Sequence, residues 1–600
     1  MMQTKCRTFR FAWSAFVLAA ILAVGGLTAT AETGEKPAAT GKPVSSKAST
    51  PDKAKADPVS DNADEVTLLK QQFALQQKQI EQLREALQEQ RELLENALQS
   101  RQASQAAEST SAQAPNLGRV ASTSPMVPKS AGKPAGGDAN LVASTLIPSE
   151  AARSAVVAGN PPSKEEEEAS PLQFRIGSAY VTPVGFMDFT SVWRDHTGGS
   201  GIGTNFGGIP YGNVFQNNLS EFRLSMQNSR VGFRIDALVK GAHVIGYMES
   251  DFLGNNPGNV AVSSNSNTLR SRLYWVDLRK SNWEVLGGQT WSLITPGRTG
   301  ISPLPGDLFF TQNIDVNYQL GLAWGRIPEF RFVCHPRKTV AFALALDSPE
   351  QYVGGSAGGG LVTFPSALAS TYGNELNTGG NTLGVPNVAP DVIAKLALDP
   401  SKKFHFEVGG VERNFKLWNP TTGTTYTTAG GGGFLNLNFE LSKGFRVLTN
   451  NFWSDGGGRY IFGQAPDLIA RADGSPSLIH ASSTVSGFEY THQNTLLYSY
   501  YGGLYVGRNV AINTDGAPVG YGYTGSPAGQ NRAIQEATFG FNQTLWKDVK
   551  YGALNFMGQY SYLTRNPWSV ATGKPNDANM NMVFFNLRYT LPGSAPTLGK

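Results

Sequence analysis

The chain has 600 residues, of which 50 are Lys or Arg and 46 are Asp or Glu, so its formal net charge at pH 7 is only +4. A chain this close to neutrality lacks the strongly basic balance typical of nucleic-acid binding, so we expect no nucleic-acid partner. Glycine is abundant, with 67 residues, and charged residues make up only 16% of the chain. That composition is typical of a β-rich chain with many loops.

The first segment has the pattern of an export signal. Basic residues precede an apolar run from Phe11 to Leu27, and Ala29-Thr30-Ala31 is a small-x-small cleavage site. We predict a cleaved signal peptide over 1–31; the alternative is a membrane anchor, although the run is short for a spanning helix. No later segment is apolar enough for such a helix, so a mature protein that enters a membrane must do so as a closed barrel.

The next part of the chain contains a segment with regularly spaced apolar residues between two segments of low hydrophobicity. Residues 32–62 are rich in Ala, Lys, Pro and Ser, which predicts disorder. Over 63–102, apolar residues recur at alternating spacings of three and four, which predicts a self-associating coiled-coil helix. Gln76 and Gln90 occupy its seam and would fix its register. The alternative is a lone surface helix. Residues 103–171 return to Ala, Ser, Pro and Gly and are predicted to be a disordered linker.

From Ala179 onward, strand-like segments follow one another to the end of the chain. Apolar residues alternate with polar or small ones, and a period of two is the signal of a strand. The number of segments, about sixteen, is even, as single-chain bacterial barrels require. The predicted strands are 180–193, 219–239, 241–254, 268–280, 283–292, 326–335, 338–347, 389–398, 403–416, 431–442, 444–454, 483–492, 495–508, 531–546, 549–564 and 578–591.

The connections between these strands alternate in length. Every second connection is a tight turn, and the others are long, whereas a soluble sandwich would mix loop lengths. We therefore predict that 172–600 form an all-β, up-and-down antiparallel transmembrane β-barrel. Its tight turns and the coiled coil would face the periplasm, and its long loops would face outward. The predicted long loops are 194–218, 255–267, 293–325, 348–388, 417–430, 455–482, 509–530 and 565–577.

The last predicted strand shows the two faces most plainly. Phe585 and Leu587 share one face, and Asn586 and Arg588 share the other. In a membrane barrel the apolar face contacts lipid and the polar face lines the lumen. Tryptophans near strand ends are expected to form an interfacial girdle. These are Trp193, Trp275, Trp283, Trp453, Trp546 and Trp568.

Basic residues divide by type, because most lysines lie in the tight turns and many arginines lie within strands. An arginine on the lipid face would cost ~2–4 kcal/mol at mid-membrane, so several must face the lumen. Arg270 and Arg272 are two apart and hence on one face, with Leu273 and Trp275 predicted on the opposite face. The predicted pore-lining residues are Arg230, Arg234, Arg270, Arg272, Arg331, Glu249 and Asp251.

The charge of this lumen favours anions. Residues 172–600 hold 32 basic against 27 acidic residues, a net charge of +5. A guanidinium fork matches a carboxylate or a phosphate, so a row of lumenal arginines predicts a pore that prefers small anionic solutes. The alternative is a general pore in which arginines and neighbouring acids, such as Arg270 with Glu249, only neutralise each other across a strand pair.

The third long connection, Leu293–Gly325, is rich in proline and has an apolar centre. Apolar content in an outward loop indicates packing, so we predict that this loop folds into the lumen and narrows it. Arg298, Asp307 and Asp315 are its predicted charged residues at the constriction. The alternatives are a contact between subunits and an ordinary exposed loop.

The motifs of enzymes do not occur in this sequence. The six histidines form no metal-binding spacing, and there is no nucleophile elbow or phosphate-binding loop. Glu249 and Asp251 have the spacing of a catalytic pair, but two carboxylates on a lumenal wall more often shape the electric field of a pore. We therefore predict no enzymatic activity, no metal and no cofactor.

Several segments, preceded by a heptad region, resemble the DcaP-like trimeric porins of Gram-negative outer membranes. They are Ser229–Phe233, Glu249–Gly254, Leu269–Arg272 and Gly288–Ser292. The resemblance implies a sixteen-stranded homotrimer in outer-membrane lipid that passes negatively charged small molecules such as dicarboxylates. Its periplasmic coiled coil would be a possible contact with the cell wall. Phosphate-selective porins share the leading coil and an Arg-rich lumen, so phosphate is the alternative solute. An alternative from another class is a trimeric envelope tether or adhesin.

Overall fold

In the computed structural model of this chain, the described residues are 171–255, 267–304, 314–354, 362–376, 385 and 387–593. The predicted signal peptide (1–31), the segment 32–62 and the predicted coiled coil (63–102) lie outside these residues. So does the predicted linker (103–171), apart from its last residue. Among the described residues, no helix is both long and apolar enough to cross a membrane.

Most of the described residues belong to one antiparallel sheet, whose strands arise where apolar and polar residues alternate. Its strands are β1 (Phe174–Ile176), β2 (Ala179–Arg194), β3 (Glu221–Ser225), β4 (Arg230–Val239), β5 (Ala242–Asp251), β6 (Arg270–Lys280), β7 (Trp283–Trp291), β8 (Arg326–Arg337), β9 (Val340–Asp347), β10 (Asp391–Ser401), β11 (Phe404–Asn419), β12 (Thr424–Ser442), β13 (Phe445–Asp455), β16 (His480–His492), β17 (Thr495–Val506), β20 (Asn531–Asp548), β21 (Gly552–Pro567) and β22 (Ala578–Thr590).

The sheet closes on itself, so it is a barrel. The last strand, β22, pairs with β2 from Phe186↔Thr590 to Arg194↔Met582. On its other edge β2 pairs with both β3 and β4, which together make one interrupted strand. The described wall therefore contains sixteen antiparallel strands, with β1 added as a short hairpin partner of β2. This confirms the predicted fold class of the barrel.

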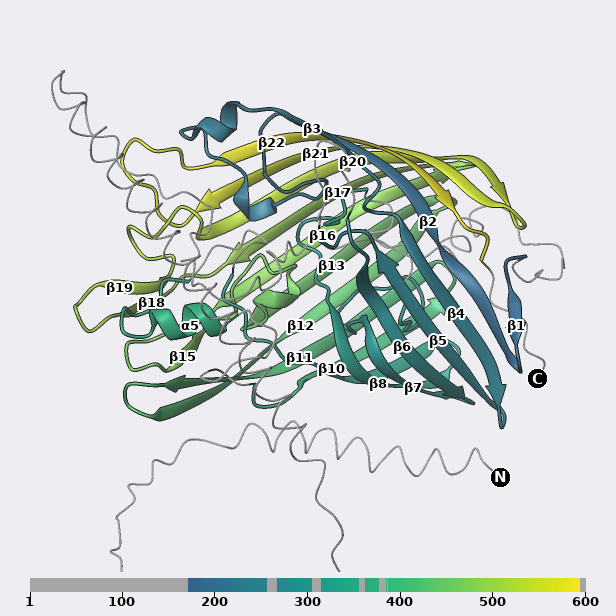
Figure 1. Cartoon of the computed structure of the whole chain (residues 1–600), viewed down its shortest axis with the longest axis horizontal. Coiled ribbons are helices and arrows are strands. Elements are labelled where there is room, and N and C mark those ends of the chain that lie inside the picture. Colours follow the sequence, from purple (N-terminus) through teal and green to yellow (C-terminus); the bar gives the residue numbers. More distant parts are fainter. Residues whose placement is uncertain are drawn as a thin grey trace, which may run out of the picture. The chain divides into compact units, whose positions relative to one another are not determined.

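The two ends of the barrel differ. In Figure 1 the tight turns lie at the end that carries β1. The long connections lie at the opposite end, with the helix α5 (Ala369–Glu375) and the hairpins β14–β15 and β18–β19. These two hairpins span Leu468–Ala470 with Pro476–Leu478 and Asn509–Ile512 with Pro518–Tyr521. The alternation of short and long connections thus matches the up-and-down wiring that the sequence predicts.

One predicted long loop is wrong. Residues 417–430 form a tight hairpin instead, because β11 continues to Asn419 and pairs there with Thr424 of β12. This stretch has many threonines and glycines and few apolar residues, so the sequence pattern does not distinguish it from a loop. Packing explains the glycine at position 430, because a Cβ there would lie 2.5 Å from Cδ1 of Leu478. The glycines therefore allow a close approach of chain segments to the wall.

The wall has an apolar outside and a polar inside, as predicted for β22. Phe585 and Leu587 are 49% and 44% exposed, whereas Asn586 and Arg588, which alternate with them, are 1% and 8% exposed. In a bilayer the exposed apolar face would lie against lipid, which makes its exposure favourable. The alternation therefore divides the two environments along the strand.

The tryptophans fit the predicted girdle only in part. Trp193, Trp283, Trp453 and Trp546 are between 42% and 51% exposed on the outer face. Trp275 is only 5% exposed, and Leu273 beside it in the alternation is fully buried. The prediction that both face away from Arg272 is wrong. The register of β5 and β6 shifts between Glu249↔Leu273 and Ser250↔Ser271, and such a bulge places consecutive residues on one face.

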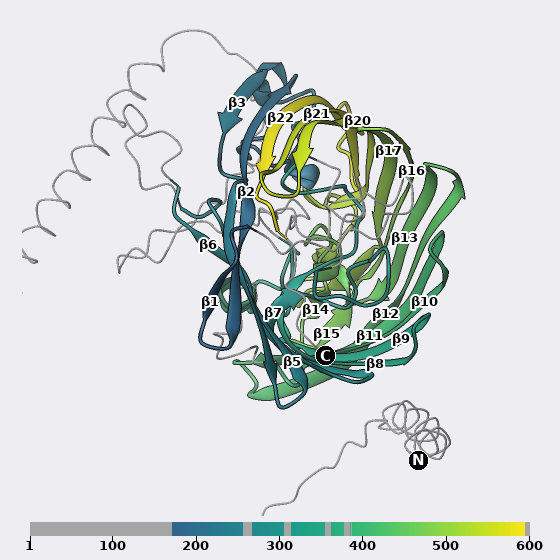
Figure 2. The ribbon, with the colours of Figure 1, turned by 90° about the vertical axis from the view of Figure 1, so that its right-hand side faces the viewer.

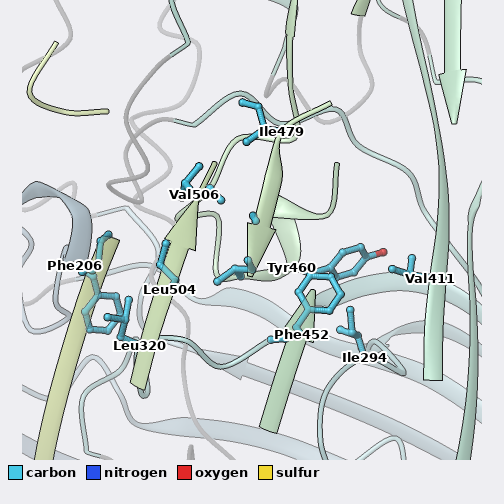
Figure 3. Packing of buried hydrophobic residues seen from close by; sticks show 14 of the residues in the cluster. Phe206, Ile294, Leu320, Val411, Phe452, Tyr460, Ile479, Leu504 and Val506 are labelled. Carbon is cyan, nitrogen blue, oxygen red and sulfur yellow. The ribbon is translucent and has the colours of Figure 1, made fainter. Parts of the chain in front are cut away.

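The inside of the ring holds connecting segments that pack against one another. Figure 2 looks along the barrel and shows these segments within the ring of strands. Figure 3 shows Phe206, Leu320 and Tyr460, which belong to three different connections, in one buried cluster with wall residues such as Phe452. Burial of one such side chain contributes ~1.5–3 kcal/mol. The long connections are therefore held by an apolar core inside the barrel.

Candidate functional site

The first limb of the third connection, residues 293–304, contacts strands other than β7 and β8, which this connection joins. The Nη2 group of Arg298 donates to both carboxylate oxygens of Glu489 on β16, at 2.7 and 2.8 Å. The backbone N–H of Gly300 donates to Asp399 on β10 at 2.9 Å. These carboxylates point inward from the wall, so this limb lies inside the barrel.

The second limb, 314–325, is attached to a different part of the inner wall. The N–H of Ile314 donates to the side chain of Gln559 on β21 at 3.1 Å. The N–H of Leu320 donates to the carboxylate of Glu536 on β20 at 2.9 Å. Polar wall residues thus accept hydrogen bonds from backbone groups that would otherwise be buried without partners. The two limbs are thus fixed to the inner wall at β10 and β16 and at β20 and β21.

Gly321 lets this limb lie directly on the wall. Its φ of +86° is in the left-handed region, where glycine is favoured. A Cβ at this position would lie 2.4 Å from the carbonyl oxygen of Thr484 and 2.8 Å from that of Gly503. Any side chain here would therefore push the loop away from β16 and β17.

Asp315 joins the third connection to the first. Its carboxylate accepts hydrogen bonds from the hydroxyl of Thr204 and from the N–H groups of Thr204 and Asn317. Burial raises the pKa of Asp315 above its ordinary value, although these donors oppose the shift. Asp307, the other acid predicted at the constriction, lies outside the described residues.

Asp315→Asn is expected to stabilise the contact between these connections at neutral pH. Because the folded-state pKa is raised, the contact is most stable in acid and loses stability as pH rises through that pKa. The amide stays neutral and removes this dependence. Hydrogen exchange of the Asn317 amide, corrected for the intrinsic pH effect, measures the change. Equal pH dependence of protection in both proteins would contradict the account.

Three of the predicted arginines meet the two predicted carboxylates on the inner wall. Arg272 contacts Glu249 through Nε at 2.6 Å and Asp251 through Nη1 at 3.0 Å. Arg270 contacts Asp251 at 2.8 Å, not Glu249 as the neutralisation alternative suggested. Arg230 reaches Glu249 only at 3.3 Å. We call these five residues the arginine cluster.

The other two predicted arginines lie apart from the arginine cluster. Arg234 makes a two-pronged contact with Asp236, at 2.9 and 3.1 Å. Arg331 pairs with Glu329 at 2.6 Å, and both side chains are buried. All five predicted arginines therefore point inward, and each has a carboxylate partner. A continuous row of free guanidinium groups is not what the structure contains.

Where ion pairs of the inner wall reach solvent, the cation is mostly the exposed partner. The carboxylate lies behind it, against the wall. The exposed fractions of the side chains, cation first, are 16% and 0% for Arg234–Asp236, 24% and 0% for Arg270–Asp251, 36% and 1% for Arg279–Asp277, and 10% and 0% for Arg588–Asp188. The solvent-exposed surface of these pairs is therefore basic even though the pairs themselves are neutral.

Some pairs depart from this pattern. Arg194 is fully buried while its partner Glu221 is 10% exposed, and His405 is 2% exposed while its partner Asp399 is 19% exposed. Arg446 and Glu440 are exposed to similar extents. Arg194 also donates to carbonyl oxygens of the first connection, which explains its burial as a structural anchor.

Sequence reasoning missed further inward charges. Lys395 on β10 contacts Glu407 on β11 at 3.1 Å and the carbonyl oxygen of Thr295 at 2.8 Å, which ties the third connection to the wall. Lys395 is two residues from both Ile393 and Ala397, which are buried, so the period of the strand places all three on the inward face. The described residues contain no group of His, Cys, Asp and Glu side chains suited to a metal ion.

No family model matches the sequence, and no curated protein matches it. Solved structures do. The outer membrane channel DcaP of Acinetobacter baumannii matches with a TM-score of 0.52 at 16% identity, over 70% of this chain and 100% of that one. An anion-selective porin from Comamonas acidovorans has a TM-score of 0.41 at 10% identity, over 69% and 99%. Salmonella typhi OmpF has a TM-score of 0.38 at 9% identity, over 70% and 100%. The first match shows that this chain shares the barrel fold of that channel.

Proposed function

We propose that this protein is an outer-membrane porin through which small hydrophilic solutes, preferentially anions such as dicarboxylates, diffuse passively. The fold supports the porin, because a closed barrel with an apolar outside and a polar inside suits a membrane and an aqueous path. The observation that carries the anion preference is the orientation of the inner ion pairs. Cations such as Arg234 and Arg270 reach solvent, and their carboxylate partners do not.

The pore-lining residues then divide into two roles. Arg234 and Arg270 contact the permeating solute directly. Arg230, Arg272 and Arg331 are buried behind this surface, where they pair with the carboxylates of Glu249, Asp251 and Glu329. An anion close to an exposed guanidinium gains a charge-assisted contact that a cation of the same size lacks. This orientation supports an anion-selective pore over a general pore, although each of these guanidinium groups has a carboxylate partner.

The third connection is the constriction in this proposal. Arg298 holds the first limb to the wall, and Asp315 holds the second limb to Thr204 of the first connection. Asp307 lies between these limbs in the sequence, so it completes the charged residues of the narrow part. A loop whose two limbs are both attached limits the width of the path and so the size of the solutes that pass. Its charged side chains then select solutes by their charge.

The remaining assignments concern the whole chain. We propose a signal peptide over 1–31, a disordered segment over 32–62, a periplasmic coiled coil over 63–102, a linker over 103–171 and the barrel over 172–600. The coiled coil would support a homotrimer in outer-membrane lipid and offers a contact with the cell wall. Phosphate is the alternative permeant anion, since a guanidinium fork also matches it.

Recording from planar bilayers separates a pore from an envelope tether. The purified protein is expected to produce stepwise current increases of uniform size, because each insertion event opens aqueous paths. A detergent-folded protein that inserts and stays electrically silent would contradict the porin and support the tether.

The double variant Arg234→Gln, Arg279→Gln is expected to reduce anion preference. Both side chains expose a cation over a buried carboxylate, so their removal leaves Asp236 and Asp277 uncompensated. The reversal potential in a potassium chloride gradient should shift toward zero or change sign. Arg471→Gln is the matched control, because Arg471 donates hydrogen bonds to Ser475, Pro476 and Ser477 within its own outer connection. An equal reversal potential in all three proteins would contradict the proposal.

A further inference from the structure

The tight turns carry most of the lysines of the barrel. All of their basic residues are exposed: Lys240, Lys280, Arg337, Lys338, Lys402, Lys403, Lys443, Lys547 and Lys550. Over the same turns (240–241, 280–282, 337–339, 402–403, 443–444, 493–494 and 547–551) the one acidic residue is Asp548. Its carboxylate accepts hydrogen bonds from backbone N–H groups of its own turn. The turns lie together at one end of the barrel (Figure 1), so these basic side chains form one patch, which we call the basic rim.

Local acids do not neutralise the part of the basic rim that is nearest to β2. Lys240 lies between β4 and β5, and Lys280 is the last residue of β6. Asp236 is held by an arginine of its own strand at 2.9 Å. Asp277 and Glu284 lie against one arginine of β6, at 2.6 and 3.5 Å. The nearby carboxylates are therefore engaged by arginines, and the two lysines remain available to another anionic partner.

A run of four glutamates, Glu165–Glu168, precedes the barrel in the sequence. Glu168 is six residues before Phe174, the first residue of β1, and a chain of this length spans at most ~20 Å. β1 lies at the tight-turn end of the barrel (Figure 1) and pairs with β2. From β2 the wall continues through β4 and β5 to β6, and each pairing adds ~4.8 Å. Lys240 and Lys280 are thus within reach of the acidic run.

We propose that the acidic run Glu165–Glu168 docks on the basic rim at Lys240 and Lys280, beside β1. The two surfaces have opposite charge, and the short covalent connection gives the run an effective concentration in the millimolar range at the rim. Exposed ion pairs are individually weak, so the docking needs several glutamates and several lysines together. A docked run fixes the point on the rim from which the predicted linker leaves the barrel. This contact does not depend on which solute passes through the barrel.

Carbodiimide coupling of the purified full-length protein in neutral detergent tests where the run lies. The reagent joins a carboxylate to an amine that contacts it, and peptide mass spectrometry locates the joined residues. Lys402 and Lys403 are the control within the same molecule, because the path from β2 through β4, β5, β6, β7, β8 and β9 to β10 takes seven pairings. At low salt, links from the acidic run to Lys240 or Lys280 should be about ten times as frequent as links to the control lysines. These links should become several times rarer in about 1 M salt, where the Debye length is only ~3 Å.

Cleavage by a glutamyl endopeptidase measures the docking without the coupling reagent. The double variant Lys240→Gln, Lys280→Gln should be cut within Glu165–Glu168 about fivefold faster than the wild type at low salt, because several weak exposed pairs are lost. The double variant Lys402→Gln, Lys403→Gln is the matched control and should be cut at the wild-type rate.

Equal frequencies of links to the two pairs of lysines would overturn the proposal, as would equal cleavage rates of the three proteins. Phosphatidylglycerol added to the detergent micelles tests the other anionic occupant of the basic rim. Links to Lys240 and Lys280 that persist with this lipid support the acidic run. Links that disappear with it would overturn the proposal, because lipid headgroups would then occupy the rim in a membrane.

Discussion

Phe539→Arg is expected to lower the free energy of unfolding of the barrel by ~2–4 kcal/mol, because it places a charge on the lipid face at mid-membrane. Phe539 lies at the middle of β20, pairs with Ser499 and Tyr560 on the neighbouring strands, and is 58% exposed. No partner for a guanidinium exists in hydrocarbon, so the cost is one of desolvation.

Leu545→Arg is the matched control on the same strand. Leu545 is 55% exposed and lies near the tight-turn end of β20, where the side chain can reach the interface. The same charge should therefore cost only ~0–1 kcal/mol there. Urea unfolding in lipid vesicles measures both values. Equal costs at the two positions would mean that β20 does not cross a bilayer with this face toward lipid.

Arg298→Ala is expected to increase the single-channel conductance by releasing the first limb of the third connection. Arg298 and Glu489 are 12% and 5% exposed, and breaking such a largely buried pair typically costs ~3–5 kcal/mol. In this variant Glu489 loses its arginine partner but still accepts a hydrogen bond from the hydroxyl of Tyr500, at 2.8 Å. A limb freed from this carboxylate leaves a wider path.

Conductance in symmetric salt measures this effect, with Arg471→Ala as a control in an outer connection. Larger and more variable current steps are expected for Arg298→Ala only. Steps of wild-type size from a folded Arg298→Ala protein would place the third connection outside the narrowest part of the path.

The sequence predicts the barrel well because its signal is local. A residue such as Phe585 or Asn586 reveals its face by its neighbours two positions away, and tight turns fix which strands pair. The break between β3 and β4 and the bulge at Arg272 are not local in this sense. They depend on how two strands pair, so the alternation alone placed Trp275 on the wrong face.

The site could be predicted only in outline. The sequence indicates that Arg230, Arg270 and Arg272 face inward, because arginine is costly on a lipid face. It does not show which carboxylate each arginine contacts, since Asp251 and Glu249 are both within reach of several. Nor does it show that carboxylates lie behind their cations, because depth within the wall depends on side-chain packing in three dimensions. The partners of the third connection are far away in the chain: Asp399 is 99 residues from Gly300, and Glu536 is 216 residues from Leu320.

The reversal potential of single wild-type channels in a potassium chloride gradient tests the central claim most directly. Guanidinium groups that reach solvent over buried carboxylates predict a potential displaced toward the equilibrium potential of chloride. A potential displaced toward that of potassium would contradict the account, because it would mean that the carboxylates and not the guanidinium groups face the permeating ions.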